Sequence, residues 1–246
     1  MELSGHGVLV TGGATGIGAA IATRFLKAGS DVLICGRRAD KLRELQERYP
    51  QLRTRVCDLE DPTQRVALRG WAISEFPSLD VLVNNAGIQQ RIQLADEPDW
   101  DLIHREIAVN FESHVHLVTL FIPHLLRCQQ PAIINVSSGL SFVPLARVPI
   151  YSATKAAIHS FTLSLRQQLR DTPIDVIEVI PPGVNTDLGG PGLHTWGVAL
   201  DEFANAVFDE VQKPDVREIA YQFSAESSRA SREALDAIFE RMNAPG

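Results

Sequence analysis

Cysteine is scarce in this sequence, and the three cysteines form neither a disulfide framework nor a metal-binding pattern. Cys35, Cys57 and Cys128 are far apart, and their number is odd. The first two lie in apolar stretches typical of buried strands, where a cysteine packs as a small hydrophobic residue. We therefore expect a protein of a reducing compartment, the cytoplasm, rather than a disulfide-stabilised secreted scaffold.

Basic charge and long apolar runs are also limited. Lysine and arginine together number 23 against 30 aspartates and glutamates, for a formal net charge of -7. This balance leaves no overall basic surface for a polyphosphate backbone, so nucleic acid is not an expected partner. The most apolar helical stretch, Val115 to Leu126, contains polar residues and is too short to span a bilayer, so no membrane partner is expected. The first six residues show no secretory signal.

A metal site is not predicted either. His114 and His116 are close in sequence, but residues two apart on a helix point to different faces and make a poor chelate.

The rest of the composition is that of an ordinary globular protein, with 45% hydrophobic and 22% charged residues. Strands are expected at Gly7–Thr11, Asp31–Gly36, Arg53–Asp58, Leu79–Asn84, Ala132–Ser137, Ile174–Ile180 and Glu218–Phe223. Helices are expected at Ile17–Ala28, Asp40–Arg48, Pro62–Phe76, Trp100–Cys128, Tyr151–Asp171, Leu200–Gln212 and Ser231–Met242. Several strands are continuously apolar, which is typical of strands covered on both faces. We predict one α/β domain over residues 1–246, a doubly wound, seven-stranded parallel sheet of Rossmann type with helices on both faces.

A glycine-rich loop follows the first expected strand. It reads Thr11-Gly12-Gly13-Ala14-Thr15-Gly16-Ile17-Gly18 and leads directly into a helix. Glycines permit a tight turn and close approach to a pyrophosphate, for which the helix N-terminus supplies free N–H groups. Glycines also form plain turns, but the strand–loop–helix context favours a nucleotide. Contacts to that nucleotide are predicted for Gly12, Thr15, Gly16, Ile17 and Gly18.

The end of the second strand indicates which nucleotide. An acidic residue there would bind the ribose hydroxyls of NAD, but this sequence has Arg37 and Arg38. Guanidinium groups at this point match a 2′-phosphate, with which they form forked hydrogen bonds. The alternative is a solvated basic turn balanced by Asp40. We predict NADP (NADPH) as the cofactor, with NAD as the less favoured choice.

Polar residues that suit proton transfer occur further along the chain. Tyr151 and Lys155 are four residues apart, so they share one helical face, and a lysine ammonium lowers the pKa of a nearby phenol. A surface pair would have the same spacing. Ser138, however, ends an apolar strand, at the sheet edge where its hydroxyl can hold a carbonyl oxygen. Asn110 is a polar residue in an apolar helical stretch and needs a partner.

At these positions the chain resembles the short-chain dehydrogenase/reductase family, in its shorter branch of about 250 residues. The resemblance implies that Tyr151 donates the proton and that Ser138 orients the carbonyl. It implies that Lys155 binds ribose hydroxyls and lowers the pKa of Tyr151, and that Asn110 holds a water linking Lys155 to solvent. Further cofactor contacts implied by the resemblance are Asp58, Leu59, Asn85, Ala86, Gly87, Val184 and Thr186.

The resemblance also implies a substrate lid at about 183–200, a C-terminal helix at about 228–242 and assembly as a homodimer or homotetramer. One departure is Pro182, which stands where the family has glycine and should stiffen the loop. His194 and Trp196 are candidate substrate contacts, although both could simply be exposed. The segments Ile133–Ser141, Pro181–Leu193 and Ser228–Met242 resemble a narrower subgroup, the oxidoreductase found beside bacterial lipoteichoic-acid D-alanylation genes.

Two functional hypotheses follow. The first is an NADP(H)-dependent oxidoreductase that interconverts a small carbonyl compound and its alcohol, with Tyr151 as general acid and base. The second is a non-catalytic NADP(H)-binding sensor or scaffold on the same fold. The complete set of Asn110, Ser138, Tyr151 and Lys155 favours the first, because binding alone does not require a proton donor.

Overall fold

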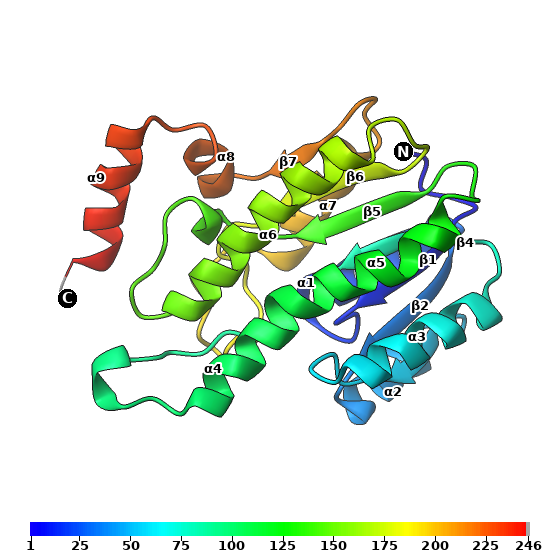
Figure 1. Ribbon diagram of the computed structural model, residues 1–246, viewed down its shortest axis with the longest axis horizontal. Coiled ribbons are helices and arrows are strands. Elements are labelled where there is room, and N and C mark those ends of the chain that lie inside the picture. The colour runs from blue at the N-terminus through cyan, green and yellow to red at the C-terminus, as the bar shows by residue number, and fades with distance from the viewer. Residues whose placement is uncertain (245–246) are drawn as a thin grey trace.

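Seven parallel strands form the centre of the molecule, and the computed structural model describes residues 1–244 (Figure 1). The strands are β1 (Gly7–Thr11), β2 (Asp31–Gly36), β3 (Arg53–Val56), β4 (Leu79–Asn84), β5 (Ala132–Val136), β6 (Asp175–Ile180) and β7 (Glu218–Ala220). They lie in the order β3-β2-β1-β4-β5-β6-β7, and every neighbouring pair is parallel. The predicted doubly wound, seven-stranded parallel sheet is confirmed.

Helices cover both faces of the sheet (Figure 1). They are α1 (Gly16–Lys27), α2 (Ala39–Arg48), α3 (Pro62–Glu75), α4 (Trp100–Ile107), α5 (Ser113–Leu125), α6 (Pro149–Gln168), α7 (Leu200–Val211), α8 (Phe223–Ser227) and α9 (Arg232–Asn243). Val8 and Val10 of β1 pack with α1, α2 and α7, whereas Leu9 packs with α3, α5 and α6. Successive residues thus enter two separate cores, which explains the continuously apolar strands. No described helix is both long and apolar enough to cross a membrane.

The helix expected over residues 100–128 is present over residues 100–125, although not as one regular α-helix. It is interrupted by a π-helical turn at Ala108–Glu112 that separates α4 from α5. The turn holds Asn110, whose side-chain amide donates to the Ile88 carbonyl at 2.8 Å while its oxygen accepts from the Ile88 N–H at 2.8 Å. A π-turn inserts one residue into a helix and is often found at functional sites.

The ends of several other elements differ from expectation. Helix α6 begins at Pro149, whose missing N–H is harmless in a first turn, rather than at Tyr151. Strand β7 ends at Ala220, and Phe223 opens the short helix α8 instead. The predicted helix at about 228–242 corresponds to α9, which starts after Ser231, whose hydroxyl accepts from the Ala234 N–H.

Strand order determines where a ligand can bind. The chain moves outward from β1 to β3 on one side and then returns to β4 on the other side of β1. Loops that leave β1 and β4 therefore diverge, and they open a crevice beyond the carboxyl ends of the strands.

Candidate active site

A cleft of about 1540 Å³ lies at the carboxyl ends of the strands. With the single exception of Asn110, all the predicted site residues line it: Gly12, Thr15, Gly16, Ile17, Gly18, Arg37, Arg38, Asp58, Leu59, Asn85, Ala86, Gly87, Ser138, Tyr151, Lys155, Val184 and Thr186. Residues from most of the chain are thus brought together in one concave site, the usual form of a small-molecule site.

The glycine-rich loop shows close backbone approach. Gly12 and Gly16 have φ values of 63° and 55°, which favour glycine. At Gly18 a Cβ atom would lie 2.3 Å from the Gly12 carbonyl oxygen, so any side chain there would displace the loop. The bare backbone, followed by the N-terminus of α1, forms a cradle that fits a pyrophosphate.

Thr11 fixes the loops after β1 and β4 relative to each other. Its hydroxyl oxygen accepts from the N–H groups of Asn85 at 3.0 Å and Ala86 at 3.1 Å, and its O–H donates to the Val83 carbonyl at 3.2 Å. The small residues after β4 therefore stay beside the phosphate loop and form a second wall of the cleft.

Arg37 and Arg38 lie at one end of the cleft and are exposed. Arg38 Nη2 donates to Thr15 Oγ1 at 2.8 Å, which holds that guanidinium beside the start of α1. Within residues 1–244 neither arginine has an ion-pair partner. Asp40 therefore does not neutralise this turn, and the two positive charges are available to an anion.

Ser138, Tyr151 and Lys155 form a nearly buried polar group on another wall of the cleft, each at most 8% exposed. Lys155 Nζ donates to the Val136 carbonyl at 2.8 Å and lies 5.7 Å from the centre of the Tyr151 ring. Ser138 Oγ accepts from the Leu140 N–H at 3.1 Å, which fixes the hydroxyl at the end of β5.

Burial dominates the ionisation of this group. It raises the pKa of Tyr151 above its usual value. The hydrogen bond to Ser138 opposes this rise, and the charge of Glu106 increases it. The expected lowering of this pKa by Lys155 is thus not what the structure shows, because desolvation of the phenolate is the larger effect. Burial also lowers the pKa of Lys155 to about 8, and the Glu178 carboxylate opposes that shift.

Asn110 lies behind the wall of the cleft rather than in it. It is fully buried, and its amide also donates to Thr154 Oγ1 at 3.2 Å. These contacts connect the π-turn to α6 next to Lys155 and to the loop after β4. Its role in holding a water stays a prediction.

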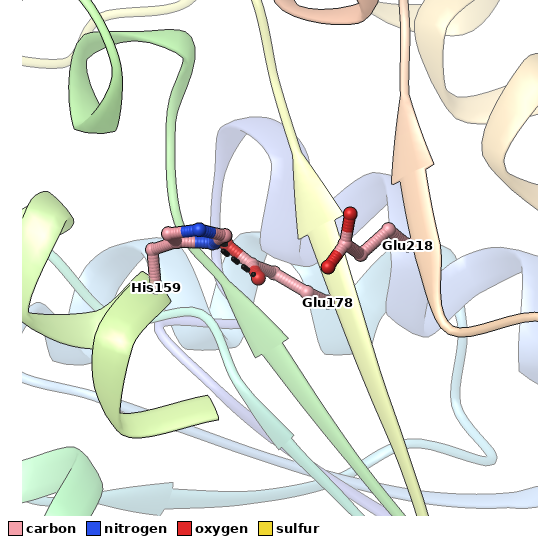
Figure 2. Close-up of side chains that lie close together, drawn as sticks. All are labelled: His159, Glu178 and Glu218. Atoms are coloured by element: carbon pink, nitrogen blue, oxygen red, sulfur yellow. Dashed lines mark hydrogen bonds and ion pairs between the residues drawn. The ribbon is translucent and has the colours of Figure 1, made fainter. Parts of the chain in front are cut away.

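A buried carboxylate beneath this group was missed from the sequence. Glu178 of β6 is completely buried and accepts hydrogen bonds from Ser137 Oγ and from His159 Nδ1, the latter at 2.9 Å (Figure 2). His159 lies one helical turn beyond Lys155 on α6. The available signal was Glu178 within the apolar run 176–180, since a buried charge requires partners.

Figure 2 also shows Glu218 of β7 near this pair. The ligand atoms of His159, Glu178 and Glu218 lie within 4.8 Å of one another, so they could in principle surround a cation. The Glu178 oxygens, however, already accept hydrogen bonds from a histidine and a serine, and Glu218 lies near Arg166 at 3.5 Å. This arrangement needs no ion to balance its charge.

A second buried carboxylate, Glu106 of α4, accepts from the Gln90 N–H at 3.2 Å. Burial raises its pKa to about 7, so a substantial fraction of Glu106 is protonated at neutral pH.

The segment predicted as a lid leaves and rejoins the fold at adjacent points. The N–H of Asn185 donates to the Val198 carbonyl at 2.9 Å, and the N–H of Val198 donates to the Gly183 carbonyl at 2.8 Å. Trp196 packs directly on Gly183, where a Cβ atom would lie 2.4 Å from the indole ring. The loop therefore has a closed base, and both His194 and Trp196 line the cleft.

The C-terminal helix α9 contacts its own chain through one side. Ile238 is buried and Met242 lines the cleft, while Phe239 is 36% exposed.

Comparisons with known proteins agree with this architecture. A family model described as short chain dehydrogenase matches residues 6–194. The chain is 43% identical to an uncharacterized oxidoreductase, DltE, of Bacillus subtilis (strain 168) over 249 residues, which cover 99% of this chain and 98% of that protein. A short chain dehydrogenase from Burkholderia cenocepacia J2315, solved in complex with NADP, is 26% identical with a TM-score of 0.83 and full coverage of both chains. A 3-ketoacyl-(acyl-carrier-protein) reductase from Brucella melitensis, complexed with NADH, is 25% identical with a TM-score of 0.79, covering 88% of this chain and 97% of that one.

Proposed function

The chain belongs to the short-chain dehydrogenase/reductase family, and from this premise we propose that it interconverts a carbonyl compound and its alcohol by hydride transfer with NADP(H). The observation that carries the proposal is the grouping of Ser138, Tyr151 and Lys155 on one wall of a cleft that also holds the glycine cradle. Binding a nucleotide requires the cradle alone, so the buried phenol favours an enzyme over a sensor or scaffold.

The residues of the cleft fit a dinucleotide. The bare loop at Gly12–Gly18 and the N-terminus of α1 would hold the pyrophosphate, and Asp58 and Leu59 would contact the adenine. Val184 and Thr186 would hold the nicotinamide end, with Lys155 on the ribose hydroxyls. When bound, the nicotinamide supplies or accepts the hydride.

The buried side chains would carry out the proton transfer. Because burial keeps the Tyr151 phenol neutral, its O–H is available to donate to a carbonyl oxygen as that oxygen gains negative charge. The Ser138 hydroxyl donates a second hydrogen bond to the same oxygen. The Lys155 ammonium next to Tyr151 would then stabilise the phenolate that proton donation leaves behind.

Turnover and cofactor binding should separate in a Tyr151→Phe variant. We expect NADPH oxidation with an accepted carbonyl substrate to be lost, while quenching of NADPH fluorescence on binding persists. Ser138→Ala should lower the rate on the order of 10²–10³-fold, as for removal of an oxyanion donor. Full turnover by Tyr151→Phe would refute the mechanism. The sensor hypothesis would be supported if the parent binds NADPH tightly but turns over no ketone, aldehyde or diketone.

We propose NADP rather than NAD as the preferred cofactor, on the basis of the two unpaired arginines after β2. Arg37→Asp should reduce affinity for NADPH much more than for NADH, because it replaces a phosphate-binding cation by an anion. Arg43→Asp is the matched control, since Arg43 has the same charge, is exposed on α2 and does not line the cleft. Equal loss in both variants would argue against the assignment.

We also propose a homodimer or homotetramer in a reducing cytoplasm. The apolar side chains of Val66, Leu126 and Leu163, which are 51%, 45% and 43% exposed, are available to such an interface. Light scattering after size-exclusion chromatography would test this, and a monomer at micromolar concentration would contradict it.

A further inference from the structure

The charge of the cleft is opposite to that of the whole protein. Seven basic residues and two acidic residues line it, although the chain as a whole has 23 basic and 30 acidic residues. The basic residues are Arg37, Arg38, Arg91, Arg105, Arg147, Lys155 and Arg241, and the acidic residues are Asp58 and Asp187. A net positive cleft in an anionic protein concentrates anions locally.

Four of the seven basic residues already have a role or a partner. Arg37 and Arg38 lie where the cofactor phosphate is proposed, Lys155 neighbours Tyr151, and Arg105 Nε forms an ion pair with Glu60 at 2.8 Å. The other three arginines make no side-chain hydrogen bond or ion pair with any residue in 1–244. They are Arg91, Arg147 and Arg241.

These three arginines come from distant parts of the sequence but from neighbouring segments of the fold. The N–H of Ile92 donates to the Arg147 carbonyl at 3.3 Å, which joins the loop after β4 to the loop that precedes α6. Asn243 then ties the end of α9 to the same loop, accepting from the Ala146 N–H at 2.6 Å and donating to the Pro144 carbonyl at 3.1 Å. Figure 1 shows α9 beside this loop.

The three arginines are exposed and line the same cleft as Ser138 and Tyr151. Arg147 lies between Ser138 and Tyr151 in sequence, on the loop that connects them. The positive charges of Arg147 and Arg91, together with burial as the larger cause, lower the pKa of His194 in the lid. The lid, the two loops and α9 therefore surround one positively charged region at the substrate end of the cleft.

We infer that the substrate is a carbonyl compound with an anionic group, a carboxylate or a phosphate, which Arg91, Arg147 and Arg241 bind while its carbonyl faces Ser138 and Tyr151. Guanidinium groups form forked, charge-assisted hydrogen bonds with both kinds of anion. At this end Asp187 is the one acidic residue that lines the cleft, against three lining arginines, while Glu106 is buried behind the lining beside Gln90. This inference rests on the proposed function.

A turnover experiment tests substrate charge. We would compare kcat/KM for oxo carboxylates of increasing chain length with that for their methyl esters, and dihydroxyacetone phosphate with dihydroxyacetone. The parent should prefer the charged member of each pair, and a variant with all three arginines changed to glutamine should lose that preference by about tenfold or more. The control variant has the same change of net charge at three exposed arginines outside the cleft: Arg43, Arg48 and Arg127. Its preference should match that of the parent.

A binding experiment tests the same inference without turnover. Titration calorimetry of the NADP⁺-loaded protein with succinate and with inorganic phosphate should show binding to the parent and to the control variant. Binding of the preferred anion should be about tenfold or more weaker in the triple cleft variant. Which of the two anions binds more tightly distinguishes a carboxylate substrate from a phosphorylated one.

The failures of the two proposals are distinguishable. If esters are turned over as well as acids, or if the triple cleft variant keeps the preference, the anionic substrate is wrong while the oxidoreductase stands. If no carbonyl compound is turned over but the arginines bind succinate or phosphate, the anion site stands and the reaction is wrong. If neither anion binds the parent at millimolar concentration, the anion site is wrong whatever the turnover.

Discussion

Replacing Lys155 by methionine should make the protein more stable while removing its activity. The side chain is 3% exposed, and burial lowers its pKa from 10.5 to about 8. A pKa depressed to this extent means that burying the ammonium costs the folded state about 3 kcal/mol at neutral pH. Methionine has a similar length and no charge, so Lys155→Met removes this cost.

The lost hydrogen bond partly offsets the gain. Without the ammonium, the Val136 carbonyl has no donor from residue 155, which costs about 1–2 kcal/mol. At pH 7 the free energy of unfolding of Lys155→Met should therefore exceed that of the parent by about 1–2 kcal/mol. If Lys155 acts as proposed, the stability lost by burying its ammonium is a cost of function.

The pH dependence gives the sharper test. The pKa of Lys155 is lower in the folded than in the unfolded protein, so between about pH 8 and 10.5 the unfolded chain binds more protons. The parent consequently gains stability relative to Lys155→Met over this range, by about 2 kcal/mol between pH 7 and pH 10. Urea unfolding at both pH values measures the difference, and Lys27→Met, at an exposed position, is the control. A difference between parent and Lys155→Met that does not change with pH would refute the reasoning.

Three further predictions concern packing and charge. Gly18→Ala should lower the free energy of unfolding by about 1–3 kcal/mol and weaken NADPH binding, because the added Cβ atom would lie 2.3 Å from a backbone oxygen. Urea unfolding measures the first effect and fluorescence titration the second. Gly183→Ala should displace Trp196, because the added Cβ atom would lie 2.4 Å from the indole ring. The displacement should change the tryptophan emission and raise KM, and an unchanged emission spectrum would contradict the packing. Glu178→Gln should destabilise the protein by about 2 kcal/mol at pH 7, because it weakens hydrogen bonds to a buried charge. Glu218→Gln is the control: Glu218 is 40% exposed, and its replacement should change stability by less than about 0.5 kcal/mol.

The sheet could be predicted because its signals are local. Strands β1, β2, β4, β5 and β6 are short, mainly apolar runs, and their burial on both faces leaves no alternation to misread. The break between α4 and α5 could not be predicted in the same way. It depends on the contact of Asn110 with Ile88, twenty-two residues away, and hydrophobic periodicity carries no information about that partner.

The site residues form the same two groups, those with a local signal in the sequence and those without one. Ser138, Tyr151 and Lys155 line the cleft as predicted from a strand end, a shared helical face and the family resemblance taken together. The arginines at 91, 147 and 241 were not predicted there, because only tertiary hydrogen bonds bring their segments together. The rise of the Tyr151 pKa through burial could not be predicted either, since the sequence shows a neighbouring charge but not the extent of burial.

The closed base of the lid has an evolutionary consequence. The two hydrogen bonds between Gly183, Asn185 and Val198 fix both ends of the loop independently of the residues between them. Loop length adds little to the free energy of closure, so a lineage can lengthen, shorten or replace residues 187–195 without altering β6, α7 or the packing of Trp196 on Gly183. Exchanging this segment between relatives should therefore change one wall of the cleft while leaving the sheet and the glycine-rich loop in place.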